Sequence, residues 1–208
     1  MTAPAKRRLG RPPASSSADT RERILDVGRR CFGELGYEST TNKYLSGRAG
    51  ITTGAIYHYF GSKLEIYVAV HDDVQDRVYR RFEEAVGDTD GFGAKLDALL
   101  DTAHQLNTED PSLARFLGAA RVDKRRHPEI AAALGDFDER RDGFYRRMVD
   151  HGVTTGEVAT GRETQVLAVV TTVLTGLNDA VSDDVVAHRA AVDSLKALFA
   201  GELINTAD

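Results

Sequence analysis

The segment 40–63, TTNKYLSGRAGITTGAIYHYFGSK, carries the side chains best suited to binding chemistry. Threonines precede two short apolar runs, and Gly50 separates the runs. A threonine hydroxyl can accept a hydrogen bond from a free N–H of a helix's first turn, and glycine readily ends a helix. The pattern therefore predicts a helix after Thr40 or Thr41, a turn at Gly50 and a second helix capped by Thr52 or Thr53.

The expected second helix carries small residues followed by consecutive rings at 57–59. Small residues allow close approach to a groove, and the polar tips of the rings can bond to phosphates or base edges. A stripe of aromatic residues usually belongs to a core, but three consecutive residues cannot all face one core. We therefore expect DNA contacts from Thr40, Thr41, Thr52, Thr53, Gly54, Ala55, Tyr57, His58, Tyr59 and Lys63.

The charge of the chain is divided unevenly along its length. Residues 1–63 hold 11 Lys and Arg against 5 Asp and Glu, whereas residues 64–208 hold 16 against 27. A basic end that faces phosphates and an acidic remainder that faces solvent suit a DNA-binding protein. Charge division of this kind also arises by chance, so it supports the interpretation without establishing it.

Residues 1–18 are basic, rich in Pro and Ser and nearly free of apolar side chains, which favours a disordered arm. Arg8 and Arg11 lie in short Arg-Pro contexts that resemble minor-groove arms, and a solubilising tail without a specific role is the alternative. The arm lacks the apolar stretch of a signal peptide, and we expect no segment to approach the length and composition of a membrane span.

Helical periodicity dominates the rest of the chain, which predicts an all-α fold. An amphipathic helix over about 19–36 would support the two short helices, and Gly152 to Gly161 would form a loop. Cys31 is the single cysteine, so an intrachain disulfide is excluded and a reducing cytoplasm is compatible. Further helices are expected over about 62–86, 94–107, 111–122, 128–152, 162–182 and 184–204.

The residues from Thr20 to about Leu64 resemble the DNA-binding domain of the tetracycline-repressor (TetR) family of bacterial regulators. The resemblance rests on TRERIL at 20–25, FGELGYESTT at 32–41, RAGI at 48–51 and the Gly54, IY, YF and SK positions that follow. Two departures are Leu45-Ser46, where the family usually has Ile-Ala, and Thr53, where a lysine is common.

The resemblance implies a basic arm (1–18), a helix-turn-helix domain (19–63) and a helical effector-binding and dimerisation domain (64–208). It implies a two-fold dimer through the last two helices, both rich in apolar residues, that reads a near-palindromic operator. A small hydrophobic ligand would enter the body and release the DNA. Candidate lining residues, each also explicable as core, are Leu99, Ala103, His104, Phe116, Ala120, Phe137, Phe144, Tyr145, Met148, Thr171 and Leu174.

Catalytic and metal-binding patterns are not found in the sequence. The six histidines are scattered, and no Gly-rich phosphate loop or exposed nucleophile motif is present. We therefore expect no cofactor, no metal and no enzyme activity. The resulting hypothesis is a dimeric, cytoplasmic, ligand-responsive repressor. The alternatives are an activator or architectural protein with the same head, and a helical small-molecule carrier or enzyme without specific DNA binding.

Overall fold

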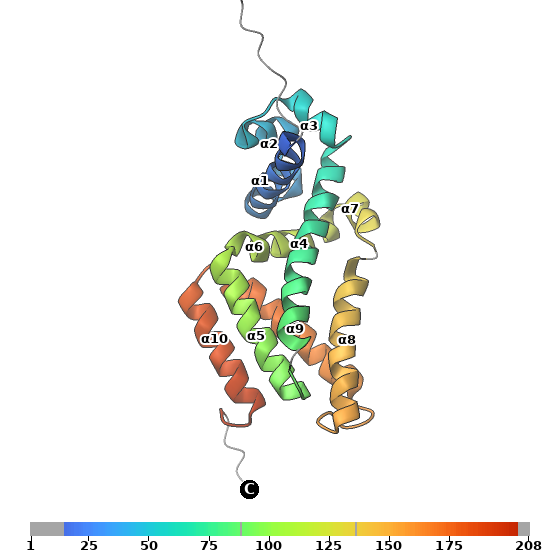
Figure 1. Cartoon of the computed structure of the whole chain (residues 1–208), viewed down its shortest axis with the longest axis vertical. Coiled ribbons are helices and arrows are strands. Elements are labelled where there is room, and N and C mark those ends of the chain that lie inside the picture. Colours follow the sequence, from blue (N-terminus) through green and yellow to red (C-terminus); the bar gives the residue numbers. More distant parts are fainter. Residues whose placement is uncertain (1–14, 88, 136, 204–208) are drawn as a thin grey trace, which may run out of the picture.

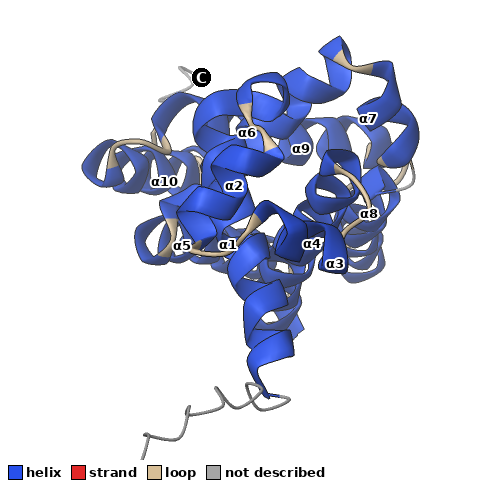
Figure 2. Ribbon diagram, turned by 90° about the horizontal axis from the view of Figure 1, so that it is seen from above, coloured by secondary structure: helices blue, strands red, loops and turns tan. Residues whose placement is uncertain are grey.

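The fold is built from helices packed around one continuous core (Figure 1). A computed structural model describes residues 15–87, 89–135 and 137–203. Within these ranges every regular element is a helix, which confirms the expected all-α class (Figure 2). The helices are α1 (Ser15–Ser39), α2 (Asn42–Ala49), α3 (Thr53–Tyr59), α4 (Lys63–Gly87), α5 (Phe92–Glu109), α6 (Pro111–Arg126), α7 (Pro128–Ala133), α8 (Phe137–Thr155), α9 (Glu163–Val181) and α10 (Val185–Phe199).

Helices α1 to α3 form a head at one end of the molecule, and α5, α8, α9 and α10 form a body at the other (Figure 1). Helix α4 runs from the head into the body, and α6 lies across the junction against α1. The expected domain boundary at 63/64 falls at the start of α4. Ile66 and Val70 join the head residues in the core, whereas Phe82 packs on Phe144 of α8. The boundary itself remains a prediction, because one core cluster runs through both parts.

Two glycines were expected at helix ends, and the structure confirms one of them. Gly36 has φ 74° and ψ 172°, which are not helical values, so the helix breaks there, and α1 joins two helical segments across this kink, the second of which ends at Ser39. Helix α8 continues past Gly152 to Thr155, so the loop expected from Gly152 is shorter. A Cβ at Gly152 would lie 2.7 Å from the Val158 side chain and 2.9 Å from that of Phe92. That glycine therefore permits close packing and does not end the helix.

The prediction of a single helix over 128–152 was also wrong, because α7 and α8 are separate. Helix α7 ends at Ala133, and Leu134 has a non-helical backbone with φ −98° and ψ 10°. Both Ile130 and Leu134 are nevertheless buried. The apolar spacing thus continues across the break, which is why periodicity alone did not reveal it.

Helix α6 is fastened to the head by buried polar groups. The Asp123 carboxylate accepts hydrogen bonds from the Tyr37 backbone N–H at 3.0 Å and from the Tyr67 hydroxyl at 3.1 Å. Burial and the neighbouring Asp123 carboxylate raise the pKa of Tyr67, so this hydroxyl remains a donor at neutral pH. One carboxylate therefore joins α6 to both α1 and α4.

A second polar junction lies around Arg29, whose side chain is 1% exposed. Its guanidinium contacts Asp26 at 2.5 Å and Asp110 at 2.7 Å, and its Nε donates to the Ser112 hydroxyl at 2.7 Å. Asp110 also caps α6 by accepting from the Ser112 backbone N–H. The start of α6 is thus held to α1 by a buried charge with several partners, the arrangement in which a buried charge is tolerated.

Helix α9 is the one helix among the described ranges that is long and apolar enough to cross a membrane, with a mean hydropathy of 1.2. The expectation that no segment has this length and composition was therefore wrong. The core helix of a soluble protein passes the same test, so the observation is weak evidence for a membrane. Only 11% of the helix window is buried, however, which leaves an apolar face uncovered within one copy of the chain.

We predict that Asp123→Ala lowers the free energy of unfolding by about 1–3 kcal/mol, because it leaves the buried donors of Tyr37 and Tyr67 without an acceptor. Tyr67→Phe removes one donor together with its hydrogen bond to Asp123, so it should lower the free energy of unfolding by less than Asp123→Ala does. Urea denaturation of both variants and of exposed Asp72→Ala measures this. Equal stability of Asp123→Ala and Asp72→Ala would show that the junction does not stabilise the fold.

Candidate nucleic-acid interface and internal cavity

Helices α2 and α3 begin and end where local side-chain chemistry sets them. Thr41 caps α2 by accepting from the Tyr44 backbone N–H at 3.1 Å, and Thr52 caps α3 by accepting from the Ala55 N–H at 3.1 Å. Gly50 ends α2 in the left-handed conformation with φ 66°, a region that favours glycine. The predicted helix, turn and helix therefore form with the expected caps.

The two short helices are held together by apolar and polar contacts. Leu45, Ile56 and Phe60 are buried in the core. The Ser46 and Thr53 hydroxyls also lie 3.0 Å apart in a hydrogen bond. These two residues stand at the two departures from the usual family pattern, and here they bond to each other. The Thr53 hydroxyl thus already has a partner on α2, although its side chain stays half-buried.

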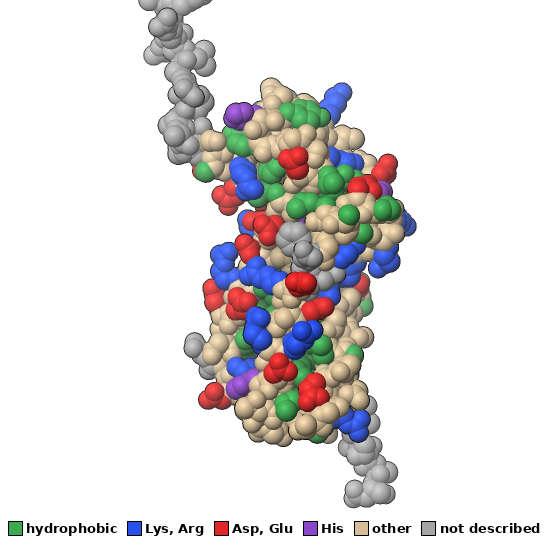
Figure 3. All heavy atoms as spheres, turned by 90° about the vertical axis from the view of Figure 1, so that its right-hand side faces the viewer, with side chains coloured by type: hydrophobic (Ala, Val, Ile, Leu, Met, Phe, Trp, Pro, Cys, Tyr) green, Lys and Arg blue, Asp and Glu red, His purple; other side chains and the backbone are tan. Residues whose placement is uncertain are grey.

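The remaining expected contact residues divide by exposure. Thr41, Thr52, Gly54 and His58 are exposed, and Tyr57 is 56% exposed. Ala55 and Tyr59 are half-buried. The Tyr59 hydroxyl donates to the Ser17 hydroxyl at 3.4 Å, which turns the ring toward α1. Helices α2 and α3, which carry the exposed set, lie at the end of the head farthest from the body (Figure 1). On the face seen in Figure 3, basic side chains are among those exposed at this end of the molecule.

Two expected contacts are corrected by the structure. Thr40 is 0% exposed, and its hydroxyl donates to the Gly36 carbonyl at 2.8 Å, so it cannot reach DNA. The Lys63 ammonium donates to the Tyr37 carbonyl at 2.8 Å and lies 4.0 Å from the centre of the Tyr37 ring. It therefore closes the end of α1 and is not directed at a phosphate. Arg8 and Arg11 lie outside the described residues.

Sequence reasoning missed exposed side chains on α2. Lys43 and Arg48 are exposed, and Tyr44 is 39% exposed. All three lie on α2, the helix that precedes α3, and two are cations of the kind that bind phosphates. Lys43 and Tyr44 lie in the first turn after the Thr41 cap, and that position was the signal that could have identified them, whereas Arg48 lies in the last turn of α2.

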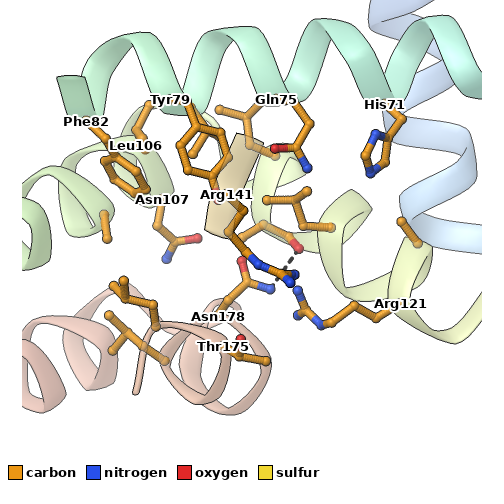
Figure 4. A pocket seen from close by; sticks show the side chains of 18 of the residues that line it. His71, Gln75, Tyr79, Phe82, Leu106, Asn107, Arg121, Arg141, Thr175 and Asn178 are labelled. Carbon is orange, nitrogen blue, oxygen red and sulfur yellow. Dashed lines mark hydrogen bonds between the residues drawn. The ribbon is translucent and has the colours of Figure 1, made fainter. Parts of the chain in front are cut away.

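A cavity of about 140 Å³ lies in the body beneath α4 and α6 (Figure 4). Of the eleven expected lining residues, Ala103, Ala120, Tyr145 and Leu174 line it. The polar side chains that line it were not expected, because we had selected mainly apolar residues. They are His71, Gln75, Tyr79, Asn107, Arg121, Lys124, Arg141, Thr175, Asn178 and His188.

The other expected residues do not line the cavity. Leu99, Phe116, Phe144 and Met148 are buried in the core. Phe144 stacks on Phe82 and contacts the edge of Tyr79, so it lies behind the cavity wall. Thr171 is half-buried elsewhere, and the Phe137 side chain lies outside what the structure describes. His104 is adjacent, because its Nδ1 lies 3.3 Å from Nδ1 of His188, which does line the cavity.

The chemistry of the cavity is that of binding. No group of three or more His, Cys, Asp or Glu side chains in the described ranges could hold a metal ion. Burial lowers the pKa of His188, and the nearby His104 lowers it further, so His188 lines the wall as a neutral ring at pH 7. The Tyr79 and Tyr145 hydroxyls bond to each other, and burial raises the pKa of both. We find no nucleophile paired with a base here.

Comparison with known proteins identifies the family. The model of bacterial regulatory proteins of the tetR family matches residues 24–70. The HTH-type transcriptional regulator TtgW of Pseudomonas putida is 31% identical over 96 residues, which cover 46% of this chain and 72% of that protein. The chain belongs to the TetR family. The regulator SrpR of Pseudomonas putida is 26% identical over 170 residues, 81% of this chain and 78% of that protein.

Solved structures share the fold over almost the whole chain. A transcriptional regulator from Saccharomonospora viridis in complex with choline aligns with a TM-score of 0.71 at 16% identity, covering 86% of this chain and 95% of that one. FadR from Bacillus subtilis in complex with stearoyl-CoA aligns with a TM-score of 0.67 at 19% identity, covering 88% and 99%. The TetR protein described here is thus a DNA-binding transcriptional regulator and not an enzyme, as the sequence predicted.

We predict that Tyr57→Ala weakens binding to specific DNA by about 1–3 kcal/mol, because an exposed ring tip on α3 would lose its base or phosphate contact. The melting temperature should not change, since Tyr57 is exposed. Thr40→Ala is the matched control from the same segment and should lower the melting temperature instead. Fluorescence anisotropy and thermal unfolding separate the two effects. If Tyr57→Ala bound DNA as tightly as the wild type, the exposed face of α3 would not be part of the DNA interface.

Proposed function

We propose that this TetR protein is a homodimeric repressor that leaves a near-palindromic operator when a small molecule enters the cavity. The exposed residues of α2 and α3 would contact the operator, and α9 with α10 would form the dimer. This proposal includes a cytoplasmic location, which DNA binding and the free, buried Cys31 support. An activator with the same head differs only in how the bound protein affects transcription.

The observation that carries the proposal is the position of α6 between cavity and head. On one side of α6, Ala120 and Arg121 line the cavity. On another side of α6, the Asp123 carboxylate accepts hydrogen bonds from the Tyr37 backbone N–H of α1, in the head, and from the Tyr67 hydroxyl of α4. A ligand that displaces α6 must therefore strain or shift these bonds. The cavity and the DNA-binding helices are connected through a single rigid element.

Helix α4 provides a second connection. Gln75, Tyr79 and Phe82 line the cavity from α4, and Tyr67 of the same helix bonds to Asp123. A ligand held between α4 and α6 could change the distance between the two heads of a dimer, provided that it binds the DNA-incompetent state more tightly. Two heads fit successive major-groove segments only at about 34 Å or a multiple of it.

The proposed dimer interface is supported by apolar side chains that one copy leaves exposed. Val169 on α9 is 47% exposed, and Val186 and Leu198 on α10 are 79% and 41% exposed. Phe199, the last residue of α10, and Leu203, which follows the helix, are 40% and 53% exposed. Exposed apolar side chains on two neighbouring helices of a monomer favour a protein partner, and a second copy of the same helices would cover them isologously.

The solved relatives support a role for the cavity without naming its ligand. One was solved with choline and another with stearoyl-CoA, which differ in size and charge. The fold therefore accommodates unlike small molecules, and the choice must depend on the lining residues of each protein. We accordingly propose an effector for this chain and derive its class from its own cavity below.

We predict that Val169→Arg and Leu198→Arg convert a dimer into a monomer, because each introduces a charge into the proposed apolar interface. Both residues are exposed in one copy, so folding should be retained. Leu35→Arg is the matched control, since Leu35 is 43% exposed but belongs to α1 and not to α9 or α10. Sedimentation velocity measures the mass of each. A dimer that persists in both variants would place the interface elsewhere.

The regulatory role is tested by binding of the purified protein to the DNA upstream of its own gene and by selection from fragmented genomic DNA. We expect specific binding that exceeds binding to random DNA and weakens with salt, as phosphate contacts require. Expression of a reporter fused to the selected site should rise when the gene for the protein is deleted. A reporter that falls instead would identify an activator, and no selected site would contradict specific DNA binding.

A further inference from the structure

The charged residues that the structure describes in the cavity lining all carry one sign. Arg121 and Lys124 reach it from α6, and Arg141 reaches it from α8. No Asp or Glu is among the described residues that line it. These three basic side chains give a positive character to a pocket whose other described lining is apolar, amide, hydroxyl or imidazole. Such a lining suits a ligand that carries a negative charge.

The two guanidinium groups converge although they repel. Arg121 and Arg141 reach inward from different helices with their heads directed toward one another, and the Asn178 amide lies beside them (Figure 4). Burial lowers the pKa of Arg121, and the positive charge of Arg141 lowers it further. Each has an acidic neighbour outside the cavity, because Arg121 pairs with Asp179 and Arg141 donates to Asp142 at 2.8 Å.

Neither of these two carboxylates lines the cavity, so the guanidinium N–H groups that face the cavity can still donate to a ligand. The Asp179 side chain is 50% exposed and that of Asp142 is 45% exposed, so water screens both. A carboxylate or phosphate that entered the cavity could accept hydrogen bonds from the planar guanidinium groups, and the charge-assisted bonds would be among the strongest available. The Asn178 Nδ2 donates to the Ala114 carbonyl and to Asp179 Oδ1, each at 3.2 Å, so this amide is fixed in orientation and leaves the anion to the two guanidinium groups.

A second, independent feature points to a ligand. The Gln75 side-chain carbonyl is buried without a hydrogen-bond partner, and so is that of Asn107. Gln75 is 8% exposed and Asn107 is 3% exposed, and both line the cavity. Buried acceptors without donors cost free energy, so their presence indicates that a donor arrives from outside the chain. Figure 4 shows both amides facing the cavity, Asn107 lying on the side of Phe82 and Leu106.

The apolar wall sets the size of the ligand body. Phe82, Leu106 and Leu174 line the cavity, and their surface suits a ring or short chain. A volume of about 140 Å³ is close to that of an engineered apolar cavity that binds benzene. The cavity therefore has room for a body of about one ring, with its charged end among the arginines.

We propose that the effector is a small organic anion, a carboxylate or phosphate on a one-ring apolar body, that carries a hydroxyl donor for Gln75 or Asn107. The anion lies between Arg121 and Arg141, and the body lies against Phe82 and Leu106. This inference rests on the proposed function, since it names the class of the effector that the cavity would take. It replaces the purely hydrophobic ligand expected from the sequence.

The test uses the full-length protein and defined probes in calorimetry and thermal unfolding. Benzoate and 4-hydroxybenzoate supply a carboxylate, phenyl phosphate supplies a phosphate, and benzamide and benzylamine are the neutral and cationic counterparts. We expect at least one of the three anions to bind and to raise the melting temperature, and 4-hydroxybenzoate to exceed benzoate. The stronger of benzoate and phenyl phosphate identifies the anionic group. The proposal would be overturned if benzamide bound as tightly as the anions. It would also be overturned if none of the three anions bound.

Variants locate the site. Arg141→Gln should weaken anion binding at least tenfold, and Arg121→Gln should do the same if it folds. Arg146→Gln, an exposed arginine on the same helix as Arg141, should leave it unchanged. Gln75→Leu and Asn107→Leu should both retain benzoate binding, and the variant that lacks the hydroxyl's acceptor should lose the advantage of 4-hydroxybenzoate. Unchanged anion binding in Arg141→Gln would overturn the assignment even if Arg121→Gln were unfolded.

DNA binding without ligand separates this inference from the proposed function. Specific DNA binding together with failure of every anion would overturn the effector class and leave the regulator intact. Anion binding that depends on Arg141, without specific DNA binding, would retain the cavity assignment and contradict the repressor. Where both hold, the anion should lower DNA affinity in the wild type and have no effect in Arg141→Gln.

Discussion

The buried carboxylate of Asp123 is the interaction on which the rest of the structure depends. Its Oδ2 accepts one bond from the backbone of α1 and one from the Tyr67 hydroxyl of α4, so three helices meet at one oxygen. Backbone and hydroxyl donors that are buried need an acceptor, and loss of the Asp123 carboxylate would leave these two donors unpaired at a cost in free energy. The orientation of α6 against the head is therefore set by a short-range, directional contact, whereas apolar packing alone would allow it to slide.

That orientation also determines where the cavity forms. Residues of α6 one turn or less from Asp123, namely Ala120, Arg121 and Lys124, lie on the cavity side. The same helix thus presents cations inward and a carboxylate to the head, and a rotation of α6 would affect both. The basic head and acidic remainder seen in the sequence describe the solvent surface, but the interior of the acidic body has the opposite sign at this one place.

Much of the fold follows from local sequence, because caps and apolar periodicity act over a few residues. Thr41, Gly50 and Thr52 set α2 and α3 where the sequence predicts. The errors occurred where a distant part of the chain decides. Gly152 lies inside α8, and it is a glycine because Val158 and Phe92 approach it too closely for any larger side chain. The break between α7 and α8 escaped notice because the buried spacing of Ile130 and Leu134 continues through it.

The site was less predictable, since exposure is a tertiary property. Thr40 and Lys63 have side chains suited to DNA, but the first is buried against Gly36 and the second is bound to Tyr37. For the cavity, a different signal was present in the sequence. Gln75 and Asn107 interrupt the apolar stripes of their helices, and a buried amide must find a partner or cost free energy. Apolar residues are inside whatever the function. Polar residues at core positions are therefore the stronger indication of a binding cavity, and here they indicate both its place and the chemistry of its ligand.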